Sequence, residues 1–160
     1  MEIRRATTED LAAVTAVERE CFPPAEAAGE DQFRARLAAY GRHFLLLFDE
    51  GRLVSFIDGM VTDERDLTDD MYADASLHRE AGAWQMIFGL NTIPARRREG
   101  LAARLVRDFI AMARQEGRQG VVLTCKARLV PYYAQFGFMD EGISCSEHGG
   151  VVWHQMRLTF

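Results

Sequence analysis

The chain has 160 residues, 48% of them hydrophobic and 27% charged, and its formal net charge is −5. These values predict one folded domain, residues 1–160, and argue against a nucleic-acid partner. Cys21, Cys125 and Cys145 match neither a metal-ligand spacing nor a disulfide framework. No apolar run approaches the ~18 residues of a membrane span, and the polar start is unlike a signal peptide. We therefore expect a cytoplasmic protein that binds no metal, membrane or nucleic acid.

The first part of the chain predicts a strand and two short helices. Residues 2–6 form the expected strand, and Thr7 with Asp10 three residues later resembles a helix capping box. Apolar side chains then recur at helical spacing up to Cys21. A loop with two prolines and a glycine, residues 22–31, separates this helix from a second one. The apolar face of the second helix holds Phe33, Leu37 and Tyr40.

The middle of the chain predicts strands. Residues 44–48 and 53–61 flank a short turn and are typical of a β-hairpin. A long polar loop follows, and its acidic part, residues 62–70, is either a solvated turn or an attractor of a cationic amine. Residues 84–93 form the most strand-like run, and Gly89 inside it indicates a bulge or a close backbone approach.

The last part predicts a long helix over residues 98–116, a buried strand over 121–125 and a short helix with Pro131 in its first turn. Two alternating segments around "SEHGG" then predict a closing hairpin. Together these elements indicate a mixed α/β fold, with strands flanked by helices.

Three arginines, Arg96, Arg97 and Arg98, precede the long helix, where the helix dipole disfavours a cation by ~0.3–1 kcal/mol. The first-turn amides of a helix lack internal partners and form an anion site, and Gly100 and Ala102 leave room for a phosphate. A bound polyanion would therefore account for the arginines. A solvated helix start with outward arginines is the alternative. Neither a P-loop nor a dinucleotide-binding fingerprint is matched.

These motifs resemble a known family. "RREGLA", Arg97 to Ala102, is similar to the R/Q-x-x-G-x-G/A pyrophosphate motif of the GCN5-related N-acetyltransferases, the GNAT family. "VPYYAQFGF", residues 130–138, is similar to the tyrosine-containing segment that follows in that family, and the order of elements matches over nearly all of the chain. Within the family, "LHREAGAWQ" and "LVPYYAQFGF" most resemble the arylalkylamine N-acetyltransferase branch.

The resemblance implies a GNAT fold, a central and mostly antiparallel sheet whose fourth and fifth strands, residues 84–93 and 121–125, splay apart. Acetyl-CoA would bind in this gap, with its pantetheine arm paired to the first of these strands and its pyrophosphate on the arginine loop. Lys126 would either reach a phosphate or be an exposed lysine. The implied cofactor-binding residues are Leu90, Asn91, Thr92, Arg97, Arg98, Glu99, Gly100, Leu101, Ala102 and Lys126.

The implied reaction is direct transfer of an acetyl group from the thioester to a primary amine, either a small molecule or a peptide. Tyr133 matches the family's acid tyrosine, and a phenol of pKa ~10 can protonate a thiolate because it keeps its proton at neutral pH. Its alternative role is that of a packed core aromatic. The alternative functions are a non-catalytic acyl-CoA-binding module and a nucleotide-binding or interaction domain. The chain could be a monomer or a homodimer.

One departure from the arylalkylamine branch concerns the base. That branch carries two histidines where this chain has Met86 and Phe88, and neither side chain can move a proton. With Trp84 they are either core residues or the wall of an acceptor pocket. Cys125 has no base neighbour in the sequence that would make it a nucleophile. The remaining candidate bases are Glu18, Glu20, His78, His148 and His154.

Overall fold

The computed structural model describes all 160 residues. Its helices are α1 (Leu11–Cys21), α2 (Glu30–Tyr40), α3 (Asp69–Ala73), α4 (Leu101–Gln115) and α5 (Val130–Ala134). Its strands are β1 (Glu2–Arg5), β2 (Phe44–Asp49), β3 (Arg52–Asp58), β4 (Val61–Thr62), β5 (Trp84–Ile87), β6 (Gly89–Thr92), β7 (Gly120–Cys125), β8 (Met139–Ile143) and β9 (His154–Thr159). None of the helices combines the length and the apolar character needed to cross a bilayer.

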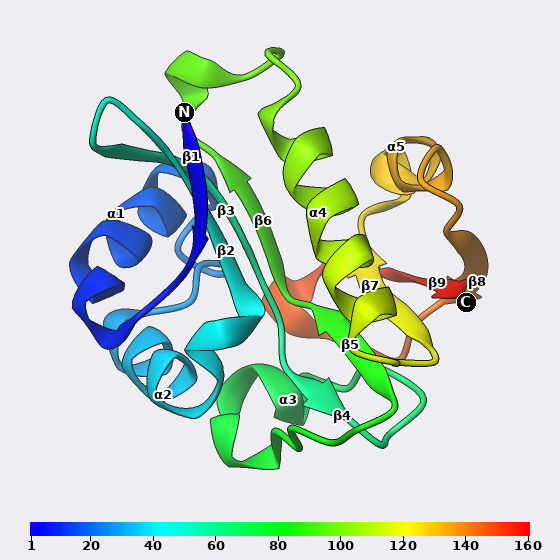
Figure 1. Cartoon of the computed structure of the whole chain (residues 1–160). Helices are drawn as coiled ribbons and strands as arrows, with labels where there is room; N and C mark the ends of the chain where they lie inside the picture. Colours follow the sequence, from blue (N-terminus) through cyan, green and yellow to red (C-terminus); the bar gives the residue numbers. More distant parts are fainter.

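The strands form two sheets, ordered β1-β2-β3-β6 and β4-β5-β7-β9-β8. Every pairing is antiparallel except the one between β5 and β7. Figure 1 shows α1 and α2 covering the first sheet from one side and α4 lying along the opening between β6 and β7. The mixed α/β fold and the closing hairpin of β8 and β9 are thus confirmed.

Two predicted strands are each divided between the sheets. Residues 84–93 separate at Phe88 into β5, which pairs with β7, and β6, which pairs with β3. Residues 53–61 separate at Gly59 into β3 and β4. A Cβ at Gly59 would overlap the Met86 carbonyl, and one at Gly89 would lie 2.9 Å from Asp58 Oδ1. Glycine at position 59 thus lets the Met86 backbone pass closely, and glycine at position 89 makes room for the Asp58 side chain.

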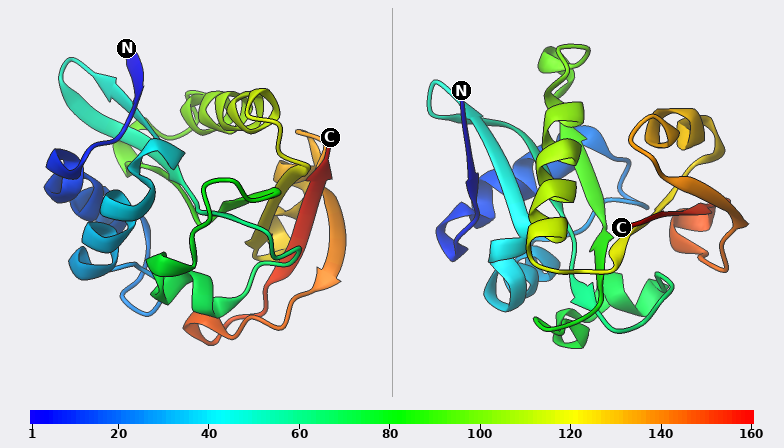
Figure 2. Two further views of the ribbon diagram at one scale, coloured as in Figure 1. Left: turned by 60° about the horizontal axis from the view of Figure 1, so that its bottom comes forward. Right: turned by 45° about the vertical axis from the view of Figure 1, so that its right-hand side comes forward.

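The helices follow from their apolar spacing. Leu101, Leu105, Phe109 and Met112 are buried along one face of α4, which packs on β2, β3, β6 and β7. Figure 2 shows this helix bridging the two sheets on one side of the opening. The capping box of Thr7 and Asp10 is confirmed, although the turn that it caps is a 3₁₀ turn leading into α1.

The loop predicted after residue 61 is partly ordered by burial. It contains α3, and Leu67 and Met71 are buried. Two of its acidic side chains bind the closing hairpin region, since Asp69 accepts the Ser146 hydroxyl and Asp66 pairs with Arg157. This loop is therefore not simply a solvated turn, because it joins the middle of the chain to its end.

Candidate functional site

The opening between the sheets exposes a free strand edge. β6 pairs only with β3, and Ile93 donates its N–H to the Val54 carbonyl on that side. The Thr92 carbonyl instead accepts bonds from Cys21 Sγ at 3.3 Å and Arg97 Nε at 3.1 Å, so it points away from β3. Because the two edges of a strand alternate residue by residue, the backbone amide of Leu90 also faces the opening.

A tight loop closes one end of this opening. Arg98 and Gly100 have left-handed φ values of +66° and +80°, a conformation that costs little at glycine and more at arginine. Gly100 caps α4 with no side-chain hydrogen bond, and a Cβ there would meet nothing within 4 Å. The first-turn amides of α4 are therefore uncapped and open, which is the arrangement that binds anions.

A cleft of about 590 Å³ runs between this loop and the free edge of β6. The predicted cofactor residues that line it are Leu90, Asn91, Thr92, Arg97, Arg98, Gly100, Leu101 and Ala102. Arg128, Tyr132 and Gln135 also line the cleft, and sequence reasoning missed them. Their signal was weak, because they lie beyond the arginine motif, on α5 or next to its ends, in a segment considered mainly for Tyr133.

Two predicted cofactor residues have side chains engaged elsewhere. Glu99 pairs with Arg96, whose guanidinium also reaches Asp49 at 2.8 Å, so Arg96 holds the loop in place. The ammonium of Lys126 lies 2.8 Å from the carboxylate of Glu26, and Lys126 does not line the cleft. The structure therefore favours neither of the two roles considered for Lys126.

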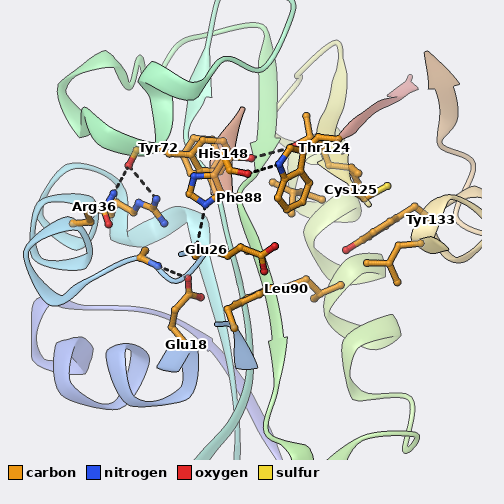
Figure 3. A pocket seen from close by; sticks show the side chains of 18 residues that line it. Glu18, Glu26, Arg36, Tyr72, Phe88, Leu90, Thr124, Cys125, Tyr133 and His148 are labelled. Carbon is orange, nitrogen blue, oxygen red and sulfur yellow. Dashed lines mark hydrogen bonds between the residues drawn. The ribbon is translucent and has the colours of Figure 1, made fainter. Parts of the chain in front are cut away.

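The cleft continues inward into a smaller cavity of about 150 Å³. The two share Phe22, Leu90, Leu129 and Tyr133 in their walls. Figure 3 shows the inner cavity between the sheets, with a cluster of rings at one end. The ring of Tyr72 lies 4.7 Å from that of Phe88 and stacks at 5.2 Å on that of His148, and Trp153 completes the wall.

Tyr133 stands where the cleft and the inner cavity meet. Its side chain is 8% exposed, and burial raises its pKa above the ordinary phenol value, so it keeps its proton at neutral pH. Figure 3 shows its hydroxyl pointing into the cavity. Tyr132 lines the cleft but not the inner cavity, and its ring packs edge-on against that of Phe136.

Two of the candidate bases lie in the inner cavity, Glu18 and His148. Glu18 is 6% exposed, and burial raises the pKa of its carboxyl. The Nε2–H of His148 donates to the Glu26 carbonyl at 3.0 Å, which leaves Nδ1 as the acceptor nitrogen. Glu20, His78 and His154 do not line the cavity, and His78 and His154 lie near Glu80 and Asp140.

The alternating residues of the 84–93 segment take different roles. Trp84 and Met86 are buried in the core, whereas Phe88 lines the inner cavity. Burial raises the pKa of the Cys125 thiol to about 11, so Cys125 is a thiol rather than a nucleophilic thiolate at neutral pH.

One cluster outside the cavity, His43, His78 and Glu80, has metal-ligand geometry. Gln85 donates its amide N–H to backbone carbonyls, so its oxygen accepts from His43 Nδ1 at 3.1 Å. His78 Nδ1 accepts from the Val61 amide, which places its proton on Nε2 facing Glu80. A metal would have to displace that proton, so the pattern fits hydrogen bonding between these side chains better than metal binding.

Comparisons with known proteins agree with this architecture. Residues 7–160 match the family model described as an acetyltransferase (GNAT) domain. The serotonin N-acetyltransferase of Mesocricetus auratus is 29% identical over 160 residues, covering 98% of this chain and 76% of that protein.

Two solved structures share the fold. The loading GNATL domain of CurA from Lyngbya majuscula gives a TM-score of 0.86 at 17% identity, covering 99% of this chain and 96% of that one. The GNAT-like decarboxylase GphF, in complex with isobutyryl-CoA, gives 0.83 at 20% identity, covering 99% of each chain. The chain therefore belongs to the GNAT acetyltransferase family.

Proposed function

We propose that the protein is an acetyl-CoA-dependent N-acetyltransferase that moves the acetyl group directly to a primary amine. The observation that carries the proposal is the continuity of the arginine-loop cleft with the inner cavity, which meet at Tyr133. A cofactor tail could lie in the cleft while an acceptor approaches from the cavity. Direct transfer needs this arrangement, because both reactants must be held at one junction.

The residues present fit the cofactor. Arg97, Arg98 and the uncapped amides at Gly100 would hold the pyrophosphate through charge-assisted hydrogen bonds. The free edge of β6 would pair with amide groups of the pantetheine arm, as an added strand does. Acetyl-CoA would supply an acetyl group activated as a thioester.

The chain's own groups then have defined tasks. The Leu90 amide faces the opening and would donate to an oxygen that gains negative charge. Tyr133 Oη holds a proton at neutral pH and would give it to the departing sulfur. The aromatic wall of the inner cavity would exclude water around the acceptor. Because aromatic rings pack well on one another, arylalkylamines belong among the amines to be tested.

The alternative is a non-catalytic acyl-CoA-binding module. The observation that favours it is the apolar character of Met86 and Phe88 on the 84–93 segment. Met86 is fully buried and Phe88 is apolar, so neither offers a proton path. In that case coenzyme A would bind with no turnover on any amine.

Two assays on the same protein separate these functions. Thiol release from acetyl-CoA is followed over several hundred amines, and coenzyme A, ATP and NAD are compared as ligands by thermal shift. We expect coenzyme A alone to raise the unfolding temperature and at least one amine to be acetylated. Binding without turnover would favour the module, and stabilisation by ATP or NAD instead would overturn both readings.

A further inference from the structure

The inner cavity contains a buried carboxylate that is only half paired. Glu26 lies in the loop between α1 and α2 and is 9% exposed. Its Oε1 pairs with Lys126 Nζ at 2.8 Å, whereas its Oε2 is buried with no hydrogen-bond partner. A buried acceptor left unpaired costs about 1–3 kcal/mol, and more if it is charged. Figure 3 shows this carboxylate reaching into the cavity from the wall opposite the Tyr133 hydroxyl.

Contacts on several sides fix the position of Glu26. The imidazole of His148 donates to its backbone carbonyl, and Lys126 holds one of its carboxylate oxygens. Gly149, in a left-handed conformation, lies so close that an added Cβ would stand 2.8 Å from Glu26 Cγ. The "SEHGG" turn therefore packs directly on this side chain, and its glycine is required by that approach.

The other buried carboxylate of the cavity differs from Glu26. In Glu18, Oε2 accepts the Ala28 amide and Oε1 accepts the Asn91 side-chain amide, each at 2.8 Å. Both oxygens of Glu18 thus have a partner within the protein. The cavity has one carboxylate oxygen that still lacks a donor, Glu26 Oε2.

The surroundings of Glu26 Oε2 select a positively charged donor. The rings of Tyr72 and Trp153 line the same cavity, and aromatic faces attract cations as carboxylates do. The ring of Phe88, in contrast, already has the Arg36 guanidinium 5.2 Å from its centre. The cavity that contains Oε2 meets the arginine-loop cleft at Tyr133 and Leu90, which line both. Building on the proposed N-acetyltransferase function, we propose that Glu26 receives the ammonium group of the acceptor amine and sets the preference of the site for cationic substrates.

The test compares ligands in which a cationic ammonium group is replaced by a neutral hydroxyl group. Propylamine, benzylamine and 2-phenylethylamine are each titrated against the alcohol of the same skeleton, at neutral pH, with and without saturating coenzyme A. In the wild type we expect at least one ammonium ion to bind about tenfold or more tightly than its alcohol, the worth of a charge-assisted hydrogen bond. In Glu26→Gln this preference should fall to near one, with the alcohol affinity unchanged.

Two further variants keep the result interpretable. Glu147→Gln removes an equal charge from an exposed position in the neighbouring turn and should keep the preference. Glu26→Asp retains the charge but moves it back by one methylene, so it should keep part of the preference. This variant serves as the test if Glu26→Gln fails to fold.

Failure of this proposal differs from failure of the proposed function. A wild type without any ammonium preference, or a Glu26→Gln variant that keeps it, would overturn the assignment of Glu26. Failure of coenzyme A to bind would count against the N-acetyltransferase proposal alone, because the arm without coenzyme A still reports on Glu26.

Discussion

The outer cleft and the inner cavity meet at Leu90 and Tyr133, yet they are built differently. The outer cleft is formed largely by one continuous stretch, from the free edge of β6 through the arginine loop to the start of α4. The inner cavity is assembled from segments scattered between Glu18 and Trp153. A ligand held by contiguous backbone leaves a local sequence motif, whereas a cavity walled by distant loops can change its lining without disturbing that motif.

The largest expected effect is at the junction of the cleft and the cavity, where a substitution should slow the reaction itself rather than weaken cofactor binding. Tyr133→Phe should lower kcat about 100-fold, the contribution typical of a general acid, with coenzyme A affinity nearly unchanged. Tyr132→Phe, on the same helix, is the matched control and should keep its rate. Steady-state kinetics and calorimetry measure the two quantities.

The pH profile sharpens the same prediction. Burial raises the pKa of Tyr133, so the proton stays on the phenol beyond the ordinary value of ~10 and the wild-type rate should not fall there for want of this acid. An unaltered rate in Tyr133→Phe would remove this residue from the mechanism.

The next largest effect should be confined to the outer cleft. Gly100→Ala should weaken coenzyme A binding about tenfold, because a methyl group enters the space where phosphate approaches the amides. Gly51→Ala is a close control, since Gly51 also has φ +80° and open space around a Cβ, but lies in the turn between β2 and β3. Each variant should lose about 1 kcal/mol of stability from backbone strain. Equal loss of binding in both would contradict a local effect.

A smaller effect should be confined to the inner cavity. Phe88→Leu removes the ring that contacts Tyr72 and should raise the KM for the amine about threefold, with coenzyme A affinity unchanged. Phe48→Leu is the control, because each of the two rings has an arginine guanidinium over it, Arg36 at 5.2 Å for Phe88 and Arg4 at 4.6 Å for Phe48, whereas Phe48 lies on β2, away from the cavity. A shift in coenzyme A affinity in Phe88→Leu would mean that the two halves are coupled.

Arg98→Gly should move binding and stability in opposite directions. Removing the guanidinium should weaken coenzyme A binding severalfold, most strongly at low salt, because a charged phosphate contact is lost. Replacing a left-handed arginine with glycine should raise the free energy of unfolding by about 0.5 kcal/mol. Calorimetry at two salt concentrations and urea unfolding measure both. Loss of stability would show that the arginine conformation is not strained.

The smallest effect concerns stability alone. Burial raises the pKa of Glu18 above its unfolded value, so the folded state binds the proton more tightly and stability falls as pH rises between the two values. Glu18→Gln should therefore gain stability relative to wild type as pH rises from 4 to 8, with little gain at pH 4. Asn91 Oδ1, which has no partner, can accept from the new amide after a flip. Urea unfolding across this pH range measures the difference.

Local signals predicted much of the fold. Helical spacing predicted α1, α2 and α4. The lone glycine after the arginines was expected only to leave room for a phosphate, and the structure adds that it starts α4 in a left-handed conformation. The division of two predicted strands at Gly59 and Phe88 could not be predicted, because side chains alternate with the same period whichever sheet a strand joins. Gly59 is explained by the Met86 backbone and Gly89 by the Asp58 side chain, and only the folded structure shows these neighbours.

The inner cavity was the least predictable part. Phe88 was one of several apolar residues whose two roles the sequence left open. Glu26 lies in a loop with two prolines that carries no periodic pattern. The position of its side chain depends on Lys126 and Gly149, both more than 90 residues away along the chain. Such a pairing is a tertiary property and leaves no trace in local spacing.

The division of the sheet at Phe88 also bears on self-association. An unpaired strand edge on a protein surface is a template on which another chain can add and aggregate. Here the free edge of β6 lies within the cleft, whose lining also includes Phe22, Leu129 and Tyr132. Because this edge forms part of a cleft wall, its backbone groups are placed to pair with a bound ligand rather than with a strand of a neighbouring protein.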